Sequence, residues 1–112
     1  MPSMSIMTTT TDRKGPTMTM HNPAHPGEIL RDLYLTPLGV TITAAADALD
    51  VTRKHVSEIV NGHAPVSADM AVRLAAALGT EPELWVNLQA QYDLWEATQK
   101  APPKVKRLHA AA

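Results

Sequence analysis

Residues 50–63 read DVTRKHVSEIVNGH, and this stretch decides the fold that the sequence predicts. At 100° per residue, Val56, Ile59 and Val60 fall on one side of a helix, so this side is expected to pack inward. The opposite side is polar and cationic, and it carries the side chains of Arg53, Lys54, Ser57 and Asn61. The stretch therefore predicts a short amphipathic helix that turns a cationic face to solvent.

Arg53 and Lys54, the cationic pair, occupy the first turn of this helix, where the positive end of the helix dipole favours acids. Their position costs from a few tenths of a kcal/mol to about 1 kcal/mol. A functional demand explains why the cost is accepted, because Arg presents a two-pronged donor to guanine and Lys contacts guanine or a phosphate. The alternative is a solvated face on an ordinary helical bundle, which an exposed Arg-Lys pair alone would indicate.

A second short helix, ITAAADALD, precedes the cationic pair, and its alanines allow helices to approach closely. Only Asp50-Val51 separates Leu49 from Thr52, so the two helices must cross steeply, as in a helix-turn-helix. In that motif the second helix lies in the major groove of DNA and its first residues reach base edges. Ser57, one turn further on, is expected to meet the next base or a phosphate. Backbone amides and hydroxyls near Thr43, Thr52 and Asn61 are expected to hold the sugar-phosphate chain of the DNA.

The first helix and the start of the Ala-rich helix are predicted from residues that are typical of helix ends. HPGEILRDLYL begins with Pro26 in its first turn, and LTPLGVT interrupts the chain with Pro37 and Gly39. Thr41 is favoured as the N-cap of the Ala-rich helix, with Thr43 as the alternative.

Two more helices follow the cationic stretch. SADMAVRLAAALG is capped by Ser67 and ends at Gly79. TEPELWVNLQAQYDLWEA opens with Thr80 and Glu83 at the spacing of a capping box, and Pro82 fits its first turn. No β-strand is needed anywhere, so we expect an all-α fold of five helices.

The charge of the chain is unevenly distributed. Residues 21–97 contain four Lys and Arg against ten Asp and Glu, whereas the two ends hold the other six cations and only one acid. Residues 21–97, the body of the protein, thus carry a net charge of -6, which is not typical of a general nucleic-acid binder. Binding to DNA must therefore depend on one small local patch, doubled by dimerisation.

The composition divides the chain into three parts. Residues 1–20 have no hydrophobic period and predict a flexible leader, within which several methionines leave a later translation start open. Residues 21–97 form the expected helix-turn-helix DNA-binding and dimerisation domain. Residues 98–112 predict a basic disordered tail, which either keeps the protein soluble or contacts nucleic acid or a partner weakly.

The last helix carries an apolar stripe that includes both tryptophans of the sequence. Its members recur at helical spacing and are Leu84, Trp85, Leu88, Tyr92 and Trp95. Aromatic residues of this kind anchor interfaces, so the stripe predicts a dimer or partner contact, with plain core as the alternative. A two-fold dimer would place two recognition helices about 34 Å apart, and its operator would be an inverted repeat.

The sequence argues against several other classes of protein. It has no cysteine and no apolar run near the ~20 residues of a membrane span, so we expect a cytoplasmic protein. It has no Gly-rich phosphate loop or nucleophile–base pattern, so an enzyme is not expected. His21 and His25 have helical ligand spacing, but Pro23 between them argues against a metal site. No cofactor is predicted.

Over residues 22–97 the chain resembles HigA-type antitoxins, also called the virulence-associated protein I group, within the Xre-like helix-turn-helix class that includes lambdoid repressors. The resemblance is carried by HPGEIL, NG, MAxRLAxALG and WxNLQxxYDLW. It implies a five-helix, lambda-repressor-like DNA-binding dimer that represses its own operon. It also implies that the protein neutralises a HigB toxin, a RelE-like ribonuclease that cleaves mRNA on the ribosome.

Carried onto this sequence, the resemblance places Arg53, Lys54 and Ser57 at the outward base-reading positions. It places Thr43, Thr52 and Asn61 near the phosphates. The chain departs from the class at Ile42, where many relatives carry a Gln that contacts phosphate. Asp50 replaces the usual turn glycine and tolerates a positive φ better than most residues do.

Three functions fit the sequence to different degrees. The first is a dimeric operator-binding antitoxin with a HigB-like toxin as partner, and the toxin rests on the resemblance alone. The second is a stand-alone Xre-type repressor without a toxin, which the absence of a neighbouring RelE-like gene would indicate. The third is a protein-interaction module that uses the aromatic stripe and has no affinity for DNA.

Overall fold

The computed structural model describes residues 22–109, and all regular structure within this range is helical. The elements are α1 (Pro26–Ile29), η3 (Leu30–Leu35), α2 (Thr36–Leu38), α3 (Ile42–Leu49), α4 (Arg53–Val60), α5 (Ala68–Leu78) and α6 (Pro82–Thr98). Because α1, the π-helical segment η3 and α2 follow one another without a break, they form one rod, and the predicted all-α fold of five helices is confirmed. The predicted leader lies outside the described residues. Residues 99–109 contain no helix or strand.

The first rod continues through Pro37, so the predicted interruption at this residue is wrong. The N–H of Thr36 bonds to the carbonyl of Arg31, five residues back, which marks the wider π-helical turn before the proline. A wider turn accommodates the proline ring, whose nitrogen has no hydrogen to donate to the previous turn. The rod ends at Gly39, where φ is 68° and the N–H of Val40 bonds to the carbonyl of Leu35 at 2.9 Å.

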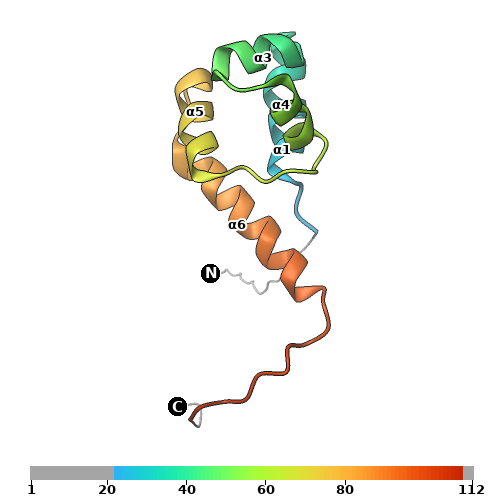
Figure 1. Cartoon of the computed structure of the whole chain (residues 1–112). Helices are drawn as coiled ribbons and strands as arrows, with labels where there is room; N and C mark the ends of the chain where they lie inside the picture. The colour runs from blue at the N-terminus through green and yellow to red at the C-terminus, as the bar shows by residue number, and fades with distance from the viewer. Residues whose placement is uncertain (1–21, 110–112) are drawn as a thin grey trace, which may run out of the picture.

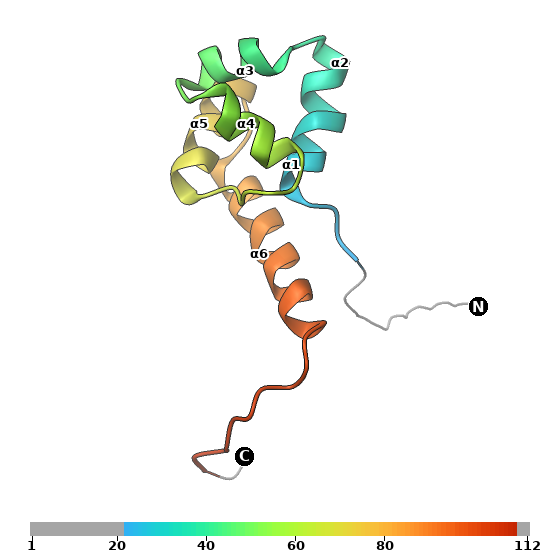
Figure 2. The same ribbon diagram turned by 45° about the vertical axis from the view of Figure 1, so that its right-hand side comes forward.

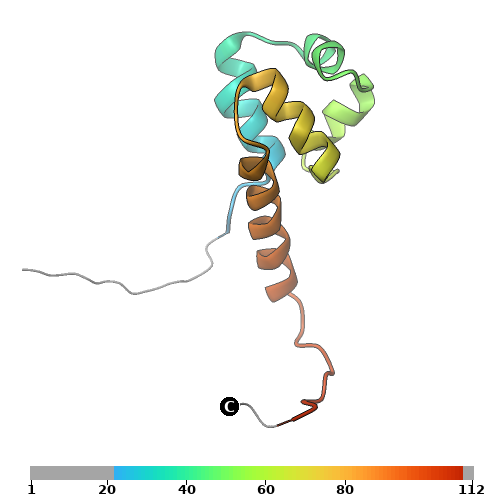
Figure 3. The ribbon, with the colours of Figure 1, turned by 90° about the vertical axis from the view of Figure 1, so that its left-hand side faces the viewer.

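The core lies between the first rod, α3, α4, α5 and the first half of α6, whereas the second half of α6 extends beyond the other helices (Figures 1 and 3). The largest fully buried side chains belong to Trp85, Leu30, Ile59, Met70, Leu74, Val56 and Pro26. The non-helical residues after α6 lie at the opposite end of the molecule from α3 (Figure 2). The helix-turn-helix and residues 99–109 are therefore well separated.

Trp85 decides how α6 begins. Its ring lies 5.5 Å from that of Tyr34, and its Nε1 donates to the Thr80 hydroxyl at 2.8 Å. A buried indole N–H needs an acceptor, so this hydroxyl is not used as a helix cap. The predicted capping box is wrong, because Glu81 is the N-cap residue and makes no side-chain cap bond.

Gln89 of α6 holds the loop between α4 and α5. Its side chain is buried, its Oε1 accepts from the N–H of Val66 at 2.7 Å, and its Nε2 donates to Asp93 at 2.8 Å. A backbone N–H left without a partner in the interior costs about 1–3 kcal/mol. Gln89 is therefore a structural clamp that the apolar pattern of the sequence did not reveal.

We expect Gln89→Ala to lower the free energy of unfolding by about 1–3 kcal/mol, because the Val66 N–H loses its acceptor. Urea unfolding followed by circular dichroism measures the change. Gln91→Ala, at an exposed position of the same helix, serves as the control and should change stability by less than about 0.5 kcal/mol. Equal losses in the two variants would contradict the clamp.

His25 caps the first rod and is the titrating group of the core. Its Nδ1 accepts from the N–H of Gly27 at 2.9 Å, and its ring meets Tyr92 edge-on with centroids 4.9 Å apart. Burial lowers the pKa of His25 below its ordinary value of 6.5, and the nearby acids Asp93, Glu28 and Glu96 oppose this shift. The neutral ring is therefore the form that the fold requires.

We expect the free energy of unfolding to fall as the pH drops below about 6.5, because the unfolded chain then binds a proton at His25 before the folded one does. Above that pH both states carry the neutral ring and this contribution is constant. His25→Asn keeps a cap acceptor and should flatten the dependence in urea titrations between pH 7.5 and 5. His63→Asn, at an exposed position, should keep the wild-type slope, and a wild-type slope in His25→Asn would refute the assignment.

Candidate nucleic-acid interface

The helices α3 and α4 form a helix-turn-helix, with Thr41 and Thr52 as N-caps. The Thr41 hydroxyl accepts from the N–H of Ala44 at 3.1 Å, which confirms Thr41 over Thr43 as the cap of α3. The Thr52 hydroxyl accepts from the N–H of His55, also at 3.1 Å. Both helices therefore begin at a capping threonine. Their first residues, Ile42 of α3 and the cationic pair of α4, lie beside one another.

The turn between the helices takes the left-handed conformation expected at Asp50. Its φ is 57° and its ψ is 48°, and it is the one non-glycine residue with a positive φ among residues 22–109. The N–H of Val51 bonds to the carbonyl of Ala46 at 3.1 Å, as at a glycine-terminated helix. Asp50 thus adopts the backbone conformation that a glycine usually takes in this turn.

The two faces of α4 follow the prediction. Val56, Ile59 and Val60 are buried in the core. Arg53 and Lys54 are exposed, and within the described residues neither side chain makes a hydrogen bond or an ion pair. The cationic pair is therefore available for an external anion.

The structure brings most of the predicted DNA-binding residues together. Arg53, Lys54 and Ser57 line one shallow hollow with Ile42, the first residue of α3. Asn61 joins this group, because its Nδ2 donates to the Ser57 hydroxyl at 3.3 Å. Thr43 is exposed in the first turn of α3, and Thr52 is the N-cap. A phosphate or a base edge approaching this hollow would meet two cations and a hydroxyl from α4, beside Ile42 of α3.

The two remaining cations of the body hold the motif in place, and the sequence did not reveal this role. Arg31 donates through Nη1 to the carbonyl of Val60, at the end of α4, at 3.3 Å. Arg73 donates through Nη1 to the carbonyl of Leu49, at the end of α3, at 2.8 Å. Cations are favourable at helix C-termini, where carbonyls lack helical partners. Two of the four body cations are thus structural, and the cationic pair remains.

Gly27 allows the first rod to lie directly against the end of α4. A Cβ atom at this position would stand 1.7 Å from the carbonyl oxygen of Ile59 and 3.0 Å from the Cα of Val60. No side chain fits in that space. A glycine in the first turn of a helix is the signal in the sequence, because glycine is otherwise unfavourable there.

The predicted stripe on α6 is divided between core and surface. Trp85 has no exposed surface, so the alternative of plain core is right for this residue, and its side chain cannot meet a partner. Leu88, Tyr92 and Trp95 are half-buried, and Leu84 is 37% exposed. A second apolar face of α6, which the sequence pattern did not reveal, points away from the core and consists of Val86, Ala90 and Leu94.

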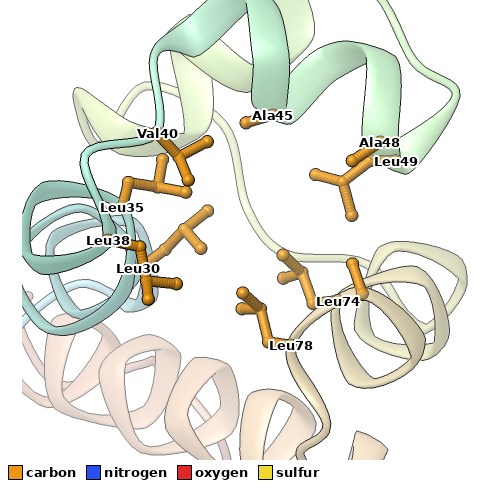
Figure 4. A pocket seen from close by; sticks show the side chains of 10 residues that line it. Leu30, Leu35, Leu38, Val40, Ala45, Ala48, Leu49, Leu74 and Leu78 are labelled. Carbon is orange, nitrogen blue, oxygen red and sulfur yellow. The ribbon is translucent and has the colours of Figure 1, made fainter.

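An apolar cavity of about 140 Å³ lies between the first rod, α3 and α5 (Figure 4). Its walls are aliphatic side chains, among them Leu30, Leu49, Leu74 and Leu78, which point toward one another in Figure 4. The lining offers no polar side chain to orient a substrate. Among residues 22–109, no helix is long and apolar enough to cross a membrane.

Comparisons with known proteins agree with this geometry. Residues 30–85 match the family described as Helix-turn-helix, HTH_3. Virulence-associated protein A' of Dichelobacter nodosus is 47% identical over 90 residues, which cover 80% of this chain and 77% of the relative. Antitoxin HigA-1 of Vibrio cholerae is 40% identical over 88 residues, which cover 79% and 83%.

Solved structures give the same picture. The Pseudomonas aeruginosa antitoxin HigA, solved with the higBA promoter, is 43% identical and superposes with a TM-score of 0.68, covering 69% of this chain and 84% of that one. Antitoxin GraA in complex with its operator is 39% identical with a TM-score of 0.67, covering 82% and 97%. These relatives are helix-turn-helix antitoxins and not enzymes, as the sequence predicted for this chain.

Proposed function

Because this chain belongs to the HigA-type antitoxins of the Xre-like helix-turn-helix family, we propose that it binds operator DNA and represses its own operon. The observation that carries the proposal is the cationic pair, exposed and unpaired in the first turn of α4 beside the start of α3. In a helix-turn-helix these positions face the base edges of the major groove. The DNA-bound structures of HigA and GraA support the same role.

Arg53 is proposed to contact guanine through its two-pronged guanidinium, with Lys54 at a neighbouring base or phosphate. Ser57 follows one turn later, on the same hollow. Thr43 is exposed in the first turn of α3, Thr52 caps α4 and Asn61 bonds to Ser57, and these three residues are proposed to hold the sugar-phosphate chain. A protein that meets operator DNA in this way is proposed to work in the cytoplasm.

The operator is tested with purified full-length protein and the DNA upstream of its own gene. Footprinting should reveal a protected inverted repeat, and fluorescence anisotropy should show tighter binding to that repeat than to a scrambled duplex. The preference is expected to be at least about 10³-fold at physiological salt. Equal affinity for both duplexes would contradict the proposed function.

We further propose that the protein acts as a homodimer through the outer side of α6. Val86, Ala90 and Leu94 recur every four residues on the face opposite Trp85, so α6 is apolar on two sides. Burying this exposed apolar face against a second subunit would be favourable, because apolar surface is removed from water. Dimerisation doubles the cationic contacts, which helps a body with a net charge of -6 to approach phosphate.

We expect Leu94→Asp to convert the dimer into a monomer, because a carboxylate would be buried without a partner in the contact. Light scattering coupled to gel filtration measures the molar mass. Leu33→Asp serves as the control, since Leu33 is 62% exposed on the first rod and Leu94 is 58% exposed on α6. A monomeric wild type, or dissociation of both variants alike, would contradict this surface.

The toxin partner is the most specific part of the proposal, and membership of the HigA-type family supports it. We propose that the chain neutralises a HigB-like toxin with the mRNA-cleaving activity of RelE-like ribonucleases. Co-expression with the adjacent gene should yield a stable complex, and growth arrest by the toxin alone should disappear. If no toxin gene lies beside it and operator binding persists, the protein is a stand-alone repressor.

A further inference from the structure

The turn of the helix-turn-helix is held from outside the motif by Arg73 of α5. Its Nη1 donates to the carbonyl oxygens of Leu49, at 2.8 Å, and Asp50, at 3.3 Å, while its Nε donates to Asp69 at 2.8 Å. These two carbonyls lie at the C-terminal end of α3, where negative partial charge accumulates. One guanidinium therefore ties α5 to the turn through three hydrogen bonds.

Asp50 is the residue of this turn that needs external support. The left-handed conformation costs an ordinary L-residue about 1–2 kcal/mol, although Asp tolerates it better than most. The bond from Arg73 to the Asp50 carbonyl fixes the peptide that joins Asp50 to Val51. Thr52 follows immediately as the N-cap of α4, so the orientation of this peptide determines where α4 begins.

The two ends of α4 are fixed by different neighbours. The far end is held by the first rod, through the bond from Arg31 to the Val60 carbonyl and the close approach of Gly27 to Ile59. The near end carries the cationic pair and follows directly on the short turn from α3, with its N-cap Thr52 two residues after Asp50. A change in the turn would therefore swing the near end of α4 about its anchored far end.

We propose that Arg73 is a positioning residue for DNA recognition, which sets the angle at which Arg53 and Lys54 enter the groove by fixing the turn carbonyls. This inference rests on the proposed function. Base contacts depend on precise geometry, whereas phosphate contacts supply affinity for DNA of any sequence. Loss of Arg73 thus weakens discrimination between operator and other DNA more than it weakens general DNA affinity.

The test compares the affinities of full-length wild type, Arg73→Gln and Arg73→Lys for two duplexes of equal length. One is the sequence protected by the wild type upstream of its gene, and the other is its scrambled version. We expect the ratio of the two affinities to fall about 10-fold in Arg73→Gln. Arg73→Lys should also lose discrimination, because a single ammonium cannot reproduce the guanidinium bonds to two carbonyls and Asp69.

Two controls separate positioning from charge and from stability. Lys100→Gln removes one exposed cation far from the turn and should leave the ratio unchanged. Gln89→Ala loosens the fold at the loop beyond α4 and should also leave the ratio unchanged when measured well below its unfolding temperature. All proteins are first checked for native circular dichroism at the assay temperature.

The outcomes are distinct. A reduced ratio in the Arg73 variants, with both controls like the wild type, supports the positioning role. An unchanged ratio in Arg73→Lys, or an equal loss in Gln89→Ala, overturns it. If the wild type itself shows no preference for the upstream sequence, the proposed function fails, and the wild-type arm reveals this before any variant is compared.

Discussion

Gly27→Ala is expected to lower the free energy of unfolding by about 3 kcal/mol or more, a large part of the 5–15 kcal/mol typical of a domain. The added methyl group would stand 1.7 Å from the Ile59 carbonyl oxygen and 2.5 Å from its carbon. Both atoms belong to the backbone of α4, so no side-chain rotation relieves the clash. The first rod and α4 would have to separate, which would open the core around Leu30.

Chemical denaturation of wild type and variant, followed by circular dichroism, measures this loss. Gly79→Ala is the matched control, because its φ is 72° but no atom lies within 4 Å of the added methyl group. That variant carries only the backbone strain of about 1–2 kcal/mol. If Gly27→Ala proves no more destabilising than Gly79→Ala, the close approach of the two helices is wrong.

Arg53→Ala is expected to reduce affinity for the operator at least about 30-fold. A good two-pronged contact to guanine is worth about 1–3 kcal/mol, and a dimer would lose two of them. The side chain is exposed and has no partner within the described residues, so its removal should leave the fold intact. Anisotropy titrations against operator and scrambled duplexes, with thermal unfolding in parallel, measure both effects.

The expected loss is specific to the operator, because Arg53 is proposed to read a base. Binding to scrambled DNA should weaken much less, by about the loss of one phosphate contact per subunit. Lys100→Gln removes a cation from the other end of the molecule and is the charge-matched control. An operator affinity that survives Arg53→Ala, or that falls equally in Lys100→Gln, would disprove base reading by Arg53.

The sequence predicted those features that depend on near neighbours in the chain. The buried face of α4 follows from the spacing of Val56, Ile59 and Val60, and the turn conformation of Asp50 follows from its place between two helices. Such patterns are local because a helix repeats every 3.6 residues. The candidate interface was predictable for the same reason, since the cationic pair and Ser57 lie within one and a half turns.

Features that depend on distant segments were missed or wrong. Arg31 and Arg73 bond to carbonyls 29 and 24 residues away, and Gln89 holds an N–H 23 residues away. The spacing of residue types along a helix does not reveal contacts between residues so far apart in the chain. Thr80 and Glu83 had the spacing of a capping box, but the buried indole of Trp85 took the Thr80 hydroxyl. The packing of the core therefore overrode a local signal.

The different surroundings of the two tryptophans make them separate spectroscopic reporters. Trp85 is completely enclosed and bonded to Thr80, so its emission should lie toward the blue and respond only when the whole chain unfolds. Trp95 is half-exposed near the end of α6 and lies 6.3 Å from the ring of Tyr92. Acrylamide should therefore quench Trp95 and leave Trp85 unaffected for as long as the chain stays folded.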